Sequence, residues 1–367
     1  MSEKMRVFVN KNIIFLPFLI LLFFLIILHP EKVMHYPNYV DWKTIVALLG
    51  LLIITTGIKE SSFLRSVAQK HLRRINNERE LALYFILLSS ILAMFLTNDI
   101  ALFIILPLTL SFQELLQNDI KKIIVFEAIS VNVGSSLTPI GNPQNLFLWH
   151  EWNISFINFI IKMIPLFMIQ FLILIAFCWI IFPARRLMPK PHNNDTKINK
   201  NLFIFSAVLL LGYILSIEFE IYYTIVFVLF LYLFLFRDVL RKADYALIVL
   251  FVVMFIDFHL FSELSLISDF ISQFNLKNPS SVFMLSLLSS QLMSNVPASI
   301  FMSKFSHEWF SIAYGVNVGG NGIVFASLAN IIALRFINKK KMYLEYHKYS
   351  LHYLVITGGL IYTLFFL

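Results

Sequence analysis

Residues 131–149 read VNVGSSLTPIGNPQNLFLW, an apolar segment that glycine and proline interrupt. The interruptions are Gly134, Pro139, Gly141 and Pro143. They exclude one continuous helix, because proline removes a backbone donor and glycine favours turns. In a chain that lies in a membrane, non-helical backbone survives only where protein or a water-filled cavity surrounds it. In such a chain this segment predicts a helix that is broken at the depth of the bilayer.

The composition places the chain in a membrane. Its 367 residues are 59% apolar and 14% charged, and the mean hydropathy is +0.80. Soluble domains have about 45–50% apolar and about 25% charged residues. The 39 Phe and 14 Tyr are too many for one aqueous core, so most must face lipid or other buried helices. We therefore predict an all-α polytopic protein of the cell membrane, with the lipid bilayer as its partner.

Several other classes of protein are excluded. Cys178 is the only cysteine, so an intrachain disulfide is excluded, and the Cys/His spacing of a zinc module is absent. The net charge of +8 comes from residues in short loops and not from a compact basic face, so we expect no nucleic-acid partner. We also expect no cofactor. The apolar run 13–28 lacks a small-residue cleavage site after it, which predicts a retained first helix.

Apolar runs alternate along the chain with two polar-interrupted regions. A bilayer core of about 30 Å needs about 20 apolar residues for each crossing, and some of the runs are shorter, so their boundaries are soft. The interrupted regions are 81–149 and 281–336, where Thr, Ser, Asn, Gly and Pro cluster. The uninterrupted runs are 13–28, 44–58, 157–182, 202–217, 221–236, 245–258 and 350–367.

The distribution of Lys and Arg predicts the topology, because these residues concentrate in cytoplasmic loops. A cytoplasmic N-terminus with non-crossing hairpins at 81–112 and 281–304 places 24 of the 29 basic residues inside and five outside. This split predicts about nine crossings plus two re-entrant hairpins, one entered from each side. The alternative is one long tilted helix over 81–112. It would place every later loop on the opposite side of the membrane, and the charge asymmetry would be lost.

Four motifs carry the polar interruptions. The inner hairpin has Thr97, Asn98 and Asp99 at its tip, within FLTNDIALFIILPLTL, and the outer hairpin has Ser294 and Asn295, within SSQLMSNVPASIFM. Each hairpin is followed by a predicted broken helix, at 121–149 and at 309–336. The second broken helix contains YGVNVGGNGIVFASLANIIAL.

The two broken helices form an internal repeat. Val131-Asn132-Val133-Gly134 and Asn145 match Val316-Asn317-Val318-Gly319 and Asn330 at a constant offset of 185 residues. The unit of hairpin and broken helix therefore occurs twice, in a first half (1–200) and a second half (201–367). Because the charge distribution places the hairpins on opposite sides, we predict inverted repeats.

Inverted repeats with broken helices that meet near the midplane are how many secondary transporters build their site. The alternative for each motif alone is structural: Thr97 and Asn98 as caps of the returning helix, and the glycines as points of close helix packing. Four motifs in an inverted pair favour a site. The predicted substrate-binding residues are Thr97, Asn98, Asn132, Gly134, Ser135, Thr138, Asn142, Ser294, Asn295, Asn317, Gly319 and Asn321.

The strings TNDIALFIILPLTL, VNVGSSLTPIGNPQNL, SNVPAS and GVNVGGNG with SLANIIAL resemble the ion transporter superfamily. The similarity covers about residues 80–336 and is to the citrate-transporter-like branch, which includes arsenite/antimonite permeases and other bacterial anion permeases. The resemblance implies a scaffold domain, a transport domain, elevator-like movement, frequent homodimers, and coupling to protons or sodium. The dicarboxylate symporters of the superfamily carry Ser-Asn-Thr at both tips; Asp99 and Val296 stand in the third place here, which argues against sodium-coupled dicarboxylate transport.

The residue types at the predicted site limit its chemistry. The four motifs contain no Lys or Arg, so helix N-termini and Asn, Ser and Thr donors would hold an anion. Asp99 is the one carboxylate in the motifs, and a lone buried carboxylate tends to take up a proton or a cation. It is the candidate coupling residue; the alternative is an N-cap for a helix beginning at Ile100. The predicted coupling-ion site, where sodium could also bind, contains Asp99, Asn98, Gly134, Asn295 and Gly319.

Other candidate residues have structural explanations. Glu127 could relay protons, although its place near Lys121 and Lys122 favours a cytoplasm-facing position. Asp257 and His259 lie near the outer end of a predicted helix, which favours the interface with water. The tryptophans Trp149, Trp152 and Trp309 fit the aromatic belt of the bilayer.

The predicted function is secondary active transport of a small anion or metalloid oxyanion. A sodium/proton antiporter is the alternative carrier, and a channel is a further one because re-entrant hairpins also build filters. An intramembrane protease would need a Gly-X-Gly-Asp motif or a His near Ser135, which the sequence lacks; we therefore expect no catalytic residues. Oxyanion, metalloid and carboxylate substrates all remain open.

Overall fold

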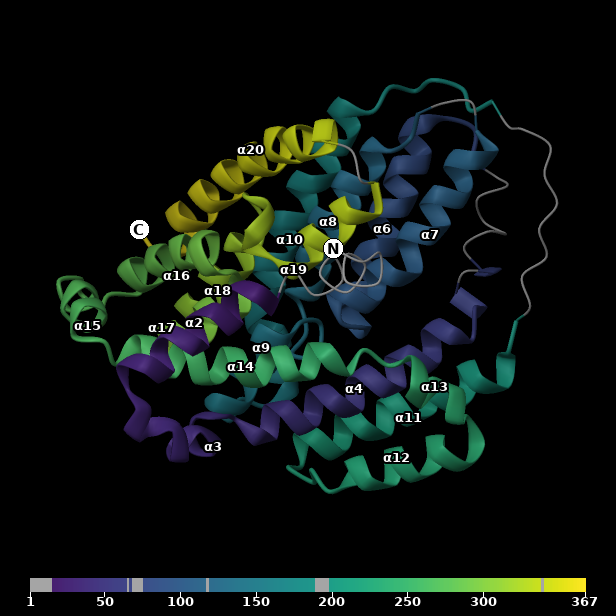
Figure 1. Ribbon diagram of the computed structural model, residues 1–367. Coiled ribbons are helices and arrows are strands. Elements are labelled where there is room, and N and C mark those ends of the chain that lie inside the picture. Colours follow the sequence, from purple (N-terminus) through teal and green to yellow (C-terminus); the bar gives the residue numbers. More distant parts are fainter. Residues whose placement is uncertain (1–14, 65, 68–74, 117–118, 189–197, 338–339) are drawn as a thin grey trace, which may run out of the picture.

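The computed structural model describes residues 15–64, 66–67, 75–116, 119–188, 198–337 and 340–367. In these ranges the regular elements are helices, and Asn77 and Arg186 form an isolated antiparallel bridge. The predicted all-α architecture is confirmed. The helices form two groups, a layer around one long helix and a bundle that contains the hairpins and broken helices (Figure 1).

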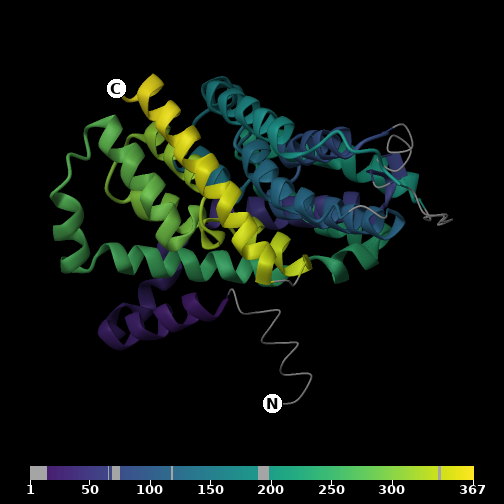
Figure 2. The ribbon, with the colours of Figure 1, turned by 90° about the horizontal axis from the view of Figure 1, so that it is seen from above.

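The first group, which we call the α4 layer, contains α4 (Trp42–Glu60) and the elements that pack on it or on its neighbours. Helix α2 (Phe15–Leu28) lies at the edge of the molecule and packs against α14 (Figure 2). The other elements of the layer are η1 (Pro30–His35), α3 (Tyr36–Tyr39), α11 (Lys200–Glu218), α12 (Thr224–Leu235), α13 (Arg237–Lys242), α14 (Tyr245–Ser262) and α15 (Ser265–Ser272).

The second group, which we call the bundle, holds all four polar motifs. Its first part is α6 (Glu78–Phe95), α7 (Asn98–Leu115), α8 (Lys122–Ser135), α9 (Pro143–Glu151) and α10 (Phe156–Ile181). Its second part is α16 (Pro279–Met293), α17 (Asn295–Ser303), α18 (Trp309–Gly319), η2 (Val324–Ala326), α19 (Leu328–Ile337) and α20 (Lys340–Phe365).

The lengths and surfaces of the helices are those of a polytopic membrane protein. In the described part, α4, α10, α11 and α14 are long and apolar enough to cross a membrane, and α2 with η1 and α3 forms a further pair that is bent by 115°. On α12 the side chains of Phe227, Phe230 and Phe234 are more than half exposed, which suits lipid and not water. The count of nine crossings and the cytoplasmic N-terminus stay predictions, and residues 13 and 14 of the first run lie outside the described ranges.

Both predicted hairpins contain a helix break at the predicted tip. Helix α6 ends at Phe95 and α7 begins at Asn98, which excludes one long helix over 81–112. Helix α16 ends at Met293 and α17 begins at Asn295. Ser294 makes the second turn with φ of +77°, a left-handed conformation that is uncommon for a residue with a side chain.

Both predicted broken helices are interrupted. The chain leaves the helix after Ser135 and re-enters it at Pro143, where the side chain of Asn142 accepts the N–H of Asn145 as an N-cap. Proline suits the first helical position because the N–H that it lacks has no partner there. The second break runs from Gly320 to Ser327 and includes Gly322 at φ of +111°.

The first arm of each hairpin crosses the first half of the following broken helix at a glycine. A Cβ on Gly134 would clash with the backbone of Ser90 in α6, and a Cβ on Gly319 would lie 2.8 Å from the carbonyl oxygen of Leu287 in α16. These contacts are backbone to backbone, so neither neighbour can move aside by changing a rotamer. The two glycines therefore set how closely each hairpin packs on its broken helix.

Candidate functional site

The inner hairpin tip is bonded to the break in the first broken helix. The backbone N–H of Asn98 donates to the carbonyl of Gly141 at 2.9 Å. The side chain of Asn98 accepts the N–H of Asp99 at 3.0 Å, which holds the first turn of α7. Thr97 is the N-cap residue of α7, but its side chain makes no capping bond.

The outer hairpin tip has the same local arrangement. The side chain of Asn295 accepts a hydrogen bond from the N–H of Val296 at 3.0 Å. The side chain of Asn98 accepts one from the N–H of Asp99 in the same way. The Ser294 hydroxyl lies 3.5 Å from the carbonyl oxygen of Ala326, and Ala326 is the position that matches Gly141 at the repeat offset. Each tip thus meets its own broken helix at the equivalent residue.

Four asparagines join the two broken helices. The amide nitrogen of Asn132 donates to the side-chain oxygen of Asn330 at 2.8 Å. The amide nitrogen of Asn317 donates to the side-chain oxygen of Asn145 at 2.7 Å. Asn132 matches Asn317 and Asn145 matches Asn330 in the repeat, so the two bonds are the same contact made in each direction. A twofold relation between two segments produces this reciprocal pattern.

A second pair of hydrogen bonds follows the same rule. The amide of Asn142 donates to the side-chain oxygen of Asn317 at 3.1 Å. The hydroxyl of Ser327 donates to the side-chain oxygen of Asn132 at 3.0 Å. Ser327 lies 185 residues after Asn142, which is the repeat offset. We call the six residues Asn132, Asn142, Asn145, Asn317, Ser327 and Asn330 the amide network.

Three members of the amide network were absent from the sequence-based site. Asn145, Ser327 and Asn330 are each at most 1% exposed, and they bond to the predicted residues Asn132 and Asn317. The gapless alignment of the two segments was the available signal, because it already paired Asn145 with Asn330. Sequence alone did not show that each would cross over to the other repeat.

The remaining predicted residues hold the breaks in shape. The hydroxyl of Ser135 donates a hydrogen bond to the carbonyl of Asn132 at 3.2 Å. It accepts one from the side-chain amide of Asn142 at 3.0 Å. The hydroxyl of Thr138 donates to the carbonyl of Met94 at 2.6 Å, which ties the first break to the end of α6. Gly134 and Gly319 face α6 and α16, so their lack of a side chain serves helix packing.

Several buried polar atoms at the breaks and tips have no hydrogen-bond partner. They include the hydroxyl of Thr97, one carboxylate oxygen of Asp99, the side-chain oxygen of Gln144, and both polar side-chain atoms of Asn321. All four residues are at most 7% exposed. More than about 90% of buried polar groups find a partner, so these atoms are candidate contacts for a ligand, an ion or water. Gln144 was not predicted.

The three candidate carboxylates are all buried, which excludes one alternative and corrects two expectations. The N-cap of α7 is Thr97, so Asp99 is not a cap for a helix beginning at Ile100. Glu127 is 0% exposed and accepts the hydroxyl of Thr109, so it does not face the cytoplasm. Asp257 is also 0% exposed and does not lie at the interface with water. The sequence did not predict the burial of Glu127 and Asp257 because it depends on distant helices. Helices α7 and α19 cover α8, which carries Glu127, and α2, α3 and α17 cover α14, which carries Asp257.

Aromatic side chains pack near the site, and the buried polar side chains near it are uncharged or acidic. Trp149 is 3% exposed and stacks on His150, so it is a core residue and not part of a lipid-facing belt. His259 stacks on Tyr39 with ring centroids 3.9 Å apart. Among the buried polar and charged side chains of the described residues there is no Lys or Arg. An anion held between the breaks would therefore meet neutral donors and helix ends.

Comparison with known proteins identifies the family. The citrate transporter family matches residues 2–329. This protein belongs to the citrate transporter family. The inner membrane protein YbiR of Escherichia coli is 34% identical over 317 residues, which are 86% of this chain and 85% of that protein. An uncharacterized transporter of Methanocaldococcus jannaschii is 36% identical over 336 residues, 89% of each chain.

More distant relatives of this citrate transporter family member match a smaller part of it. A silicon efflux transporter of rice is 26% identical over 144 residues, which are 38% of this chain and 30% of that protein. The family and these relatives show a multi-pass membrane transporter of the anion permease type, as the resemblance of the motifs predicted.

Proposed function

We propose that this protein is a secondary active transporter of a small anion or metalloid oxyanion that binds between the two broken helices and the two hairpin tips. The reciprocal amide network carries the proposal. It brings equivalent residues of the two segments together, as inverted repeats do when they meet at a midplane site. Inverted repeats also explain why each tip meets its own broken helix at an equivalent residue.

The ends of four helices supply the anion-binding chemistry. Helices α7 and α9 begin at Asn98 and Pro143, and α17 and α19 begin at Asn295 and Leu328, all next to the breaks or tips. Each helix N-terminus carries about half a positive charge. Four such ends can hold an anion without a Lys or Arg. The unpaired amide of Asn321 and the hydroxyl of Thr97 add neutral donors.

Asp99 supplies the group that binds the coupling ion, a proton or sodium. It lies in the first turn of α7, is 4% exposed, and has one carboxylate oxygen without a partner. Binding of a cation or proton in one orientation and its release in the other shifts the equilibrium between orientations by the difference in affinity, which is what coupling requires. Movement of the bundle against the α4 layer, in a homodimer whose N-termini are cytoplasmic, completes the proposed elevator-like mechanism.

A ligand screen with the purified protein tests the substrate class. Citrate and silicic acid represent the substrates named by the family and by the rice relative. Arsenite represents the permeases that the motifs resemble, and phosphate and sulfate represent other oxyanions. Thermal melting in detergent with and without sodium should show stabilisation by one class, because a ligand that binds only the folded state raises its stability. Uptake of that ligand into proteoliposomes along a proton or sodium gradient should follow. Ion exchange with no anion requirement would favour an antiporter instead, and flux far above carrier rates would favour a channel.

A further inference from the structure

A second buried carboxylate, Asp257, lies outside the proposed substrate site. It is on α14 of the α4 layer, is 0% exposed, and neither of its carboxylate oxygens has a hydrogen-bond partner. A fully buried, ionised carboxylate without a partner is strongly unfavourable. The group must therefore be neutralised by something other than the side chains that it contacts.

Two other buried polar atoms on α3 and α14 also lack a hydrogen-bond partner, the hydroxyl of Tyr36 and the ring nitrogen Nδ1 of His259. The hydroxyl of Tyr36, on α3, is buried without a partner and is close enough to Asp257 to interact with it electrostatically. The neighbouring side chains on α14, including Met254, Phe258 and Leu260, are apolar and at most 3% exposed. A sodium ion generally needs more oxygen ligands than one carboxylate and one phenol, whereas a proton needs only the carboxylate. The chemistry of this site favours a proton.

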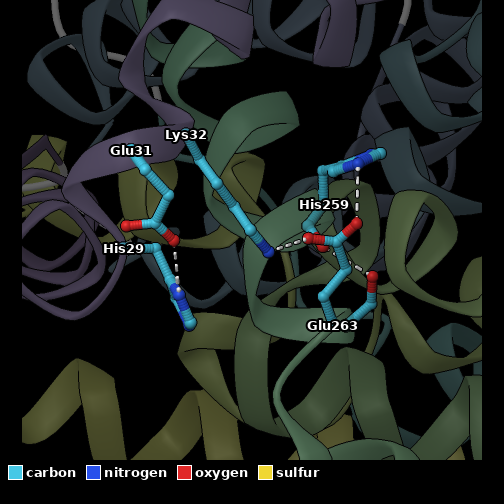
Figure 3. Close-up of polar contacts among 6 residues, drawn as sticks. His29, Glu31, Lys32, His259 and Glu263 are labelled. Atoms are coloured by element: carbon cyan, nitrogen blue, oxygen red, sulfur yellow. Dashed lines mark hydrogen bonds and ion pairs between the residues drawn. The ribbon is translucent and has the colours of Figure 1, made fainter.

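Charged groups near this end of α14 are engaged with one another. Figure 3 shows Lys32 directed at Glu263, with the ammonium nitrogen 2.7 Å from the carboxylate oxygen. His259 lies 3.5 Å from the other oxygen of Glu263. Lys304, which follows α17, interacts electrostatically with His259. These groups lie on η1, at the end of α14 and after α17, and none of the ion pairs among the described residues includes Asp257.

The position of Asp257 connects the α4 layer with the outer hairpin. Residues four apart share one face of a helix, so Asp257 lies on the same face as Phe261. The ring of Phe261 packs 5.9 Å from that of Phe301 on α17. Helix α17 begins at Asn295, the outer tip. Helix α14 therefore packs against the arm that carries this tip one turn away from Asp257.

We propose that Asp257 is a second proton-binding site of this transporter, occupied in the conformation described here and emptied when α14 and α17 separate. With its proton bound, the carboxyl is neutral, so it can stay buried among apolar side chains while α14 and α17 are in contact. Loss of the proton leaves a charge that must reach water, which opens the contact. The inference rests on the proposed transport function, and it adds a proton site at the junction of the layer and the bundle.

Infrared spectroscopy of the full-length protein tests the protonation directly. The C=O stretch of a protonated carboxyl is separate from the bands of a carboxylate. The spectrum of Asp257→Asn should lack one such band at neutral pH, whereas Asp269→Asn, which removes an exposed carboxylate of α15, should keep every band. Unchanged protonated-carboxyl bands in Asp257→Asn would overturn the proposal. Ligand-induced melting shifts in the same samples test substrate binding separately, so failure of the proton site and failure of the proposed function are distinguishable.

A second variant keeps the test valid if Asp257→Asn does not fold. Tyr36→Phe removes only the hydroxyl, so the band of Asp257 should remain, because the proton is held by the carboxyl itself. Loss of the band in Tyr36→Phe would contradict a proton held by Asp257. In proteoliposomes, the pH dependence of substrate exchange should be flatter in Asp257→Asn than in the wild type and unchanged in Asp269→Asn. A wild-type pH profile in Asp257→Asn would contradict a role of this proton in transport.

Discussion

At the scale of single residues, Asn132 and Asn317 use both ends of their side-chain amides. Asn132 donates to Asn330 and accepts from Ser327, and Asn317 donates to Asn145 and accepts from Asn142. An amide can satisfy this pattern because it carries a donor and an acceptor on one planar group. An aspartate would lose the donor, and a leucine would lose both.

Removing either amide should destabilise the bundle. Asn132→Ala and Asn317→Ala each leave buried partners unpaired, and an unsatisfied buried polar group costs about 1–3 kcal/mol. Both variants should melt at lower temperature than the wild type and should lose transport. Asn158→Ala, which removes an exposed asparagine of α10, is the matched control and should behave as the wild type.

The double variant Asn132→Ala/Asn330→Ala tests the pairing itself. Because the two residues share one bond, its effect should be smaller than the sum of the single effects. Strict additivity of the three melting temperatures would show that the bond does not contribute.

Replacing Asp99 should separate exchange from accumulation. Asp99→Asn resembles the neutral carboxyl permanently, so substrate exchange should stay measurable while accumulation against a gradient is lost. The measurement is counterflow and gradient-driven uptake in proteoliposomes, with Asp269→Asn as the control. Wild-type accumulation by Asp99→Asn would remove Asp99 from coupling and leave Glu127, Asp257 or a backbone sodium site as the alternatives.

At the scale of elements, the hairpins are packed on the broken helices through glycine. Gly134 meets Ser90 of α6, and Gly319 meets Leu287 of α16. A side chain at either position would push a hairpin arm away from the helix whose break its tip contacts. Packing and site geometry are therefore linked at these two positions.

Larger residues at these glycines should therefore disrupt both stability and transport. Inserting bulk into a packed contact costs about 1–3 kcal/mol or more, so Gly134→Leu and Gly319→Leu should lower the melting temperature and abolish uptake. Gly212→Leu is the control, because a Cβ at Gly212 has nothing within 4 Å. Normal uptake in Gly134→Leu would argue against the close crossing of α6 and α8.

At the scale of the whole molecule, polar contacts join the α4 layer to the bundle within the described ranges. One of them joins α4 to α9, where the hydroxyl of Thr44 lies 3.0 Å from the ring nitrogen of His150. An elevator-like mechanism requires this contact to break as the bundle moves. A gating mechanism confined to the hairpins leaves it intact.

Crosslinking the layer to the bundle distinguishes these mechanisms. In a Cys178→Ser background, Thr44→Cys with His150→Cys should be joined by a short thiol crosslinker, and transport should stop and recover on cleavage of the crosslink. Each single cysteine variant is a control for loss of the side chain. Continued transport by the fully crosslinked protein would exclude sliding between α4 and α9.

Thiol labelling tests the predicted topology. A cysteine at Ser66, in the Cys178→Ser background, should resist an impermeant reagent added outside intact cells, while Gln273→Cys on the predicted outer side should react. Ready labelling at Ser66 would reverse the topology. Asn194, in the segment 185–200 that is predicted to be cytoplasmic, lies outside the described residues and offers an independent position for the same experiment.

The sequence by itself determined the helical membrane class, the four interruptions and the family. Each of these depends on local chemistry: apolar runs, proline and glycine that stop helices, and a repeat at a constant offset. Phe95 and Asn98 bound the inner tip, and Ser135 and Pro143 bound the first break, as the positions of these residue types predicted.

Only the tertiary structure decided how the segments meet. That Asn145 bonds to Asn317 and Asn330 to Asn132 follows from helices more than 170 residues apart in sequence, and no local pattern specifies such a crossing. The burial of Glu127 and Asp257 likewise depends on which helices cover them, and charge spacing along one helix cannot show this. Local sequence sets where helices stop, whereas packing between distant helices sets which polar groups are removed from water and which of them remain unpaired.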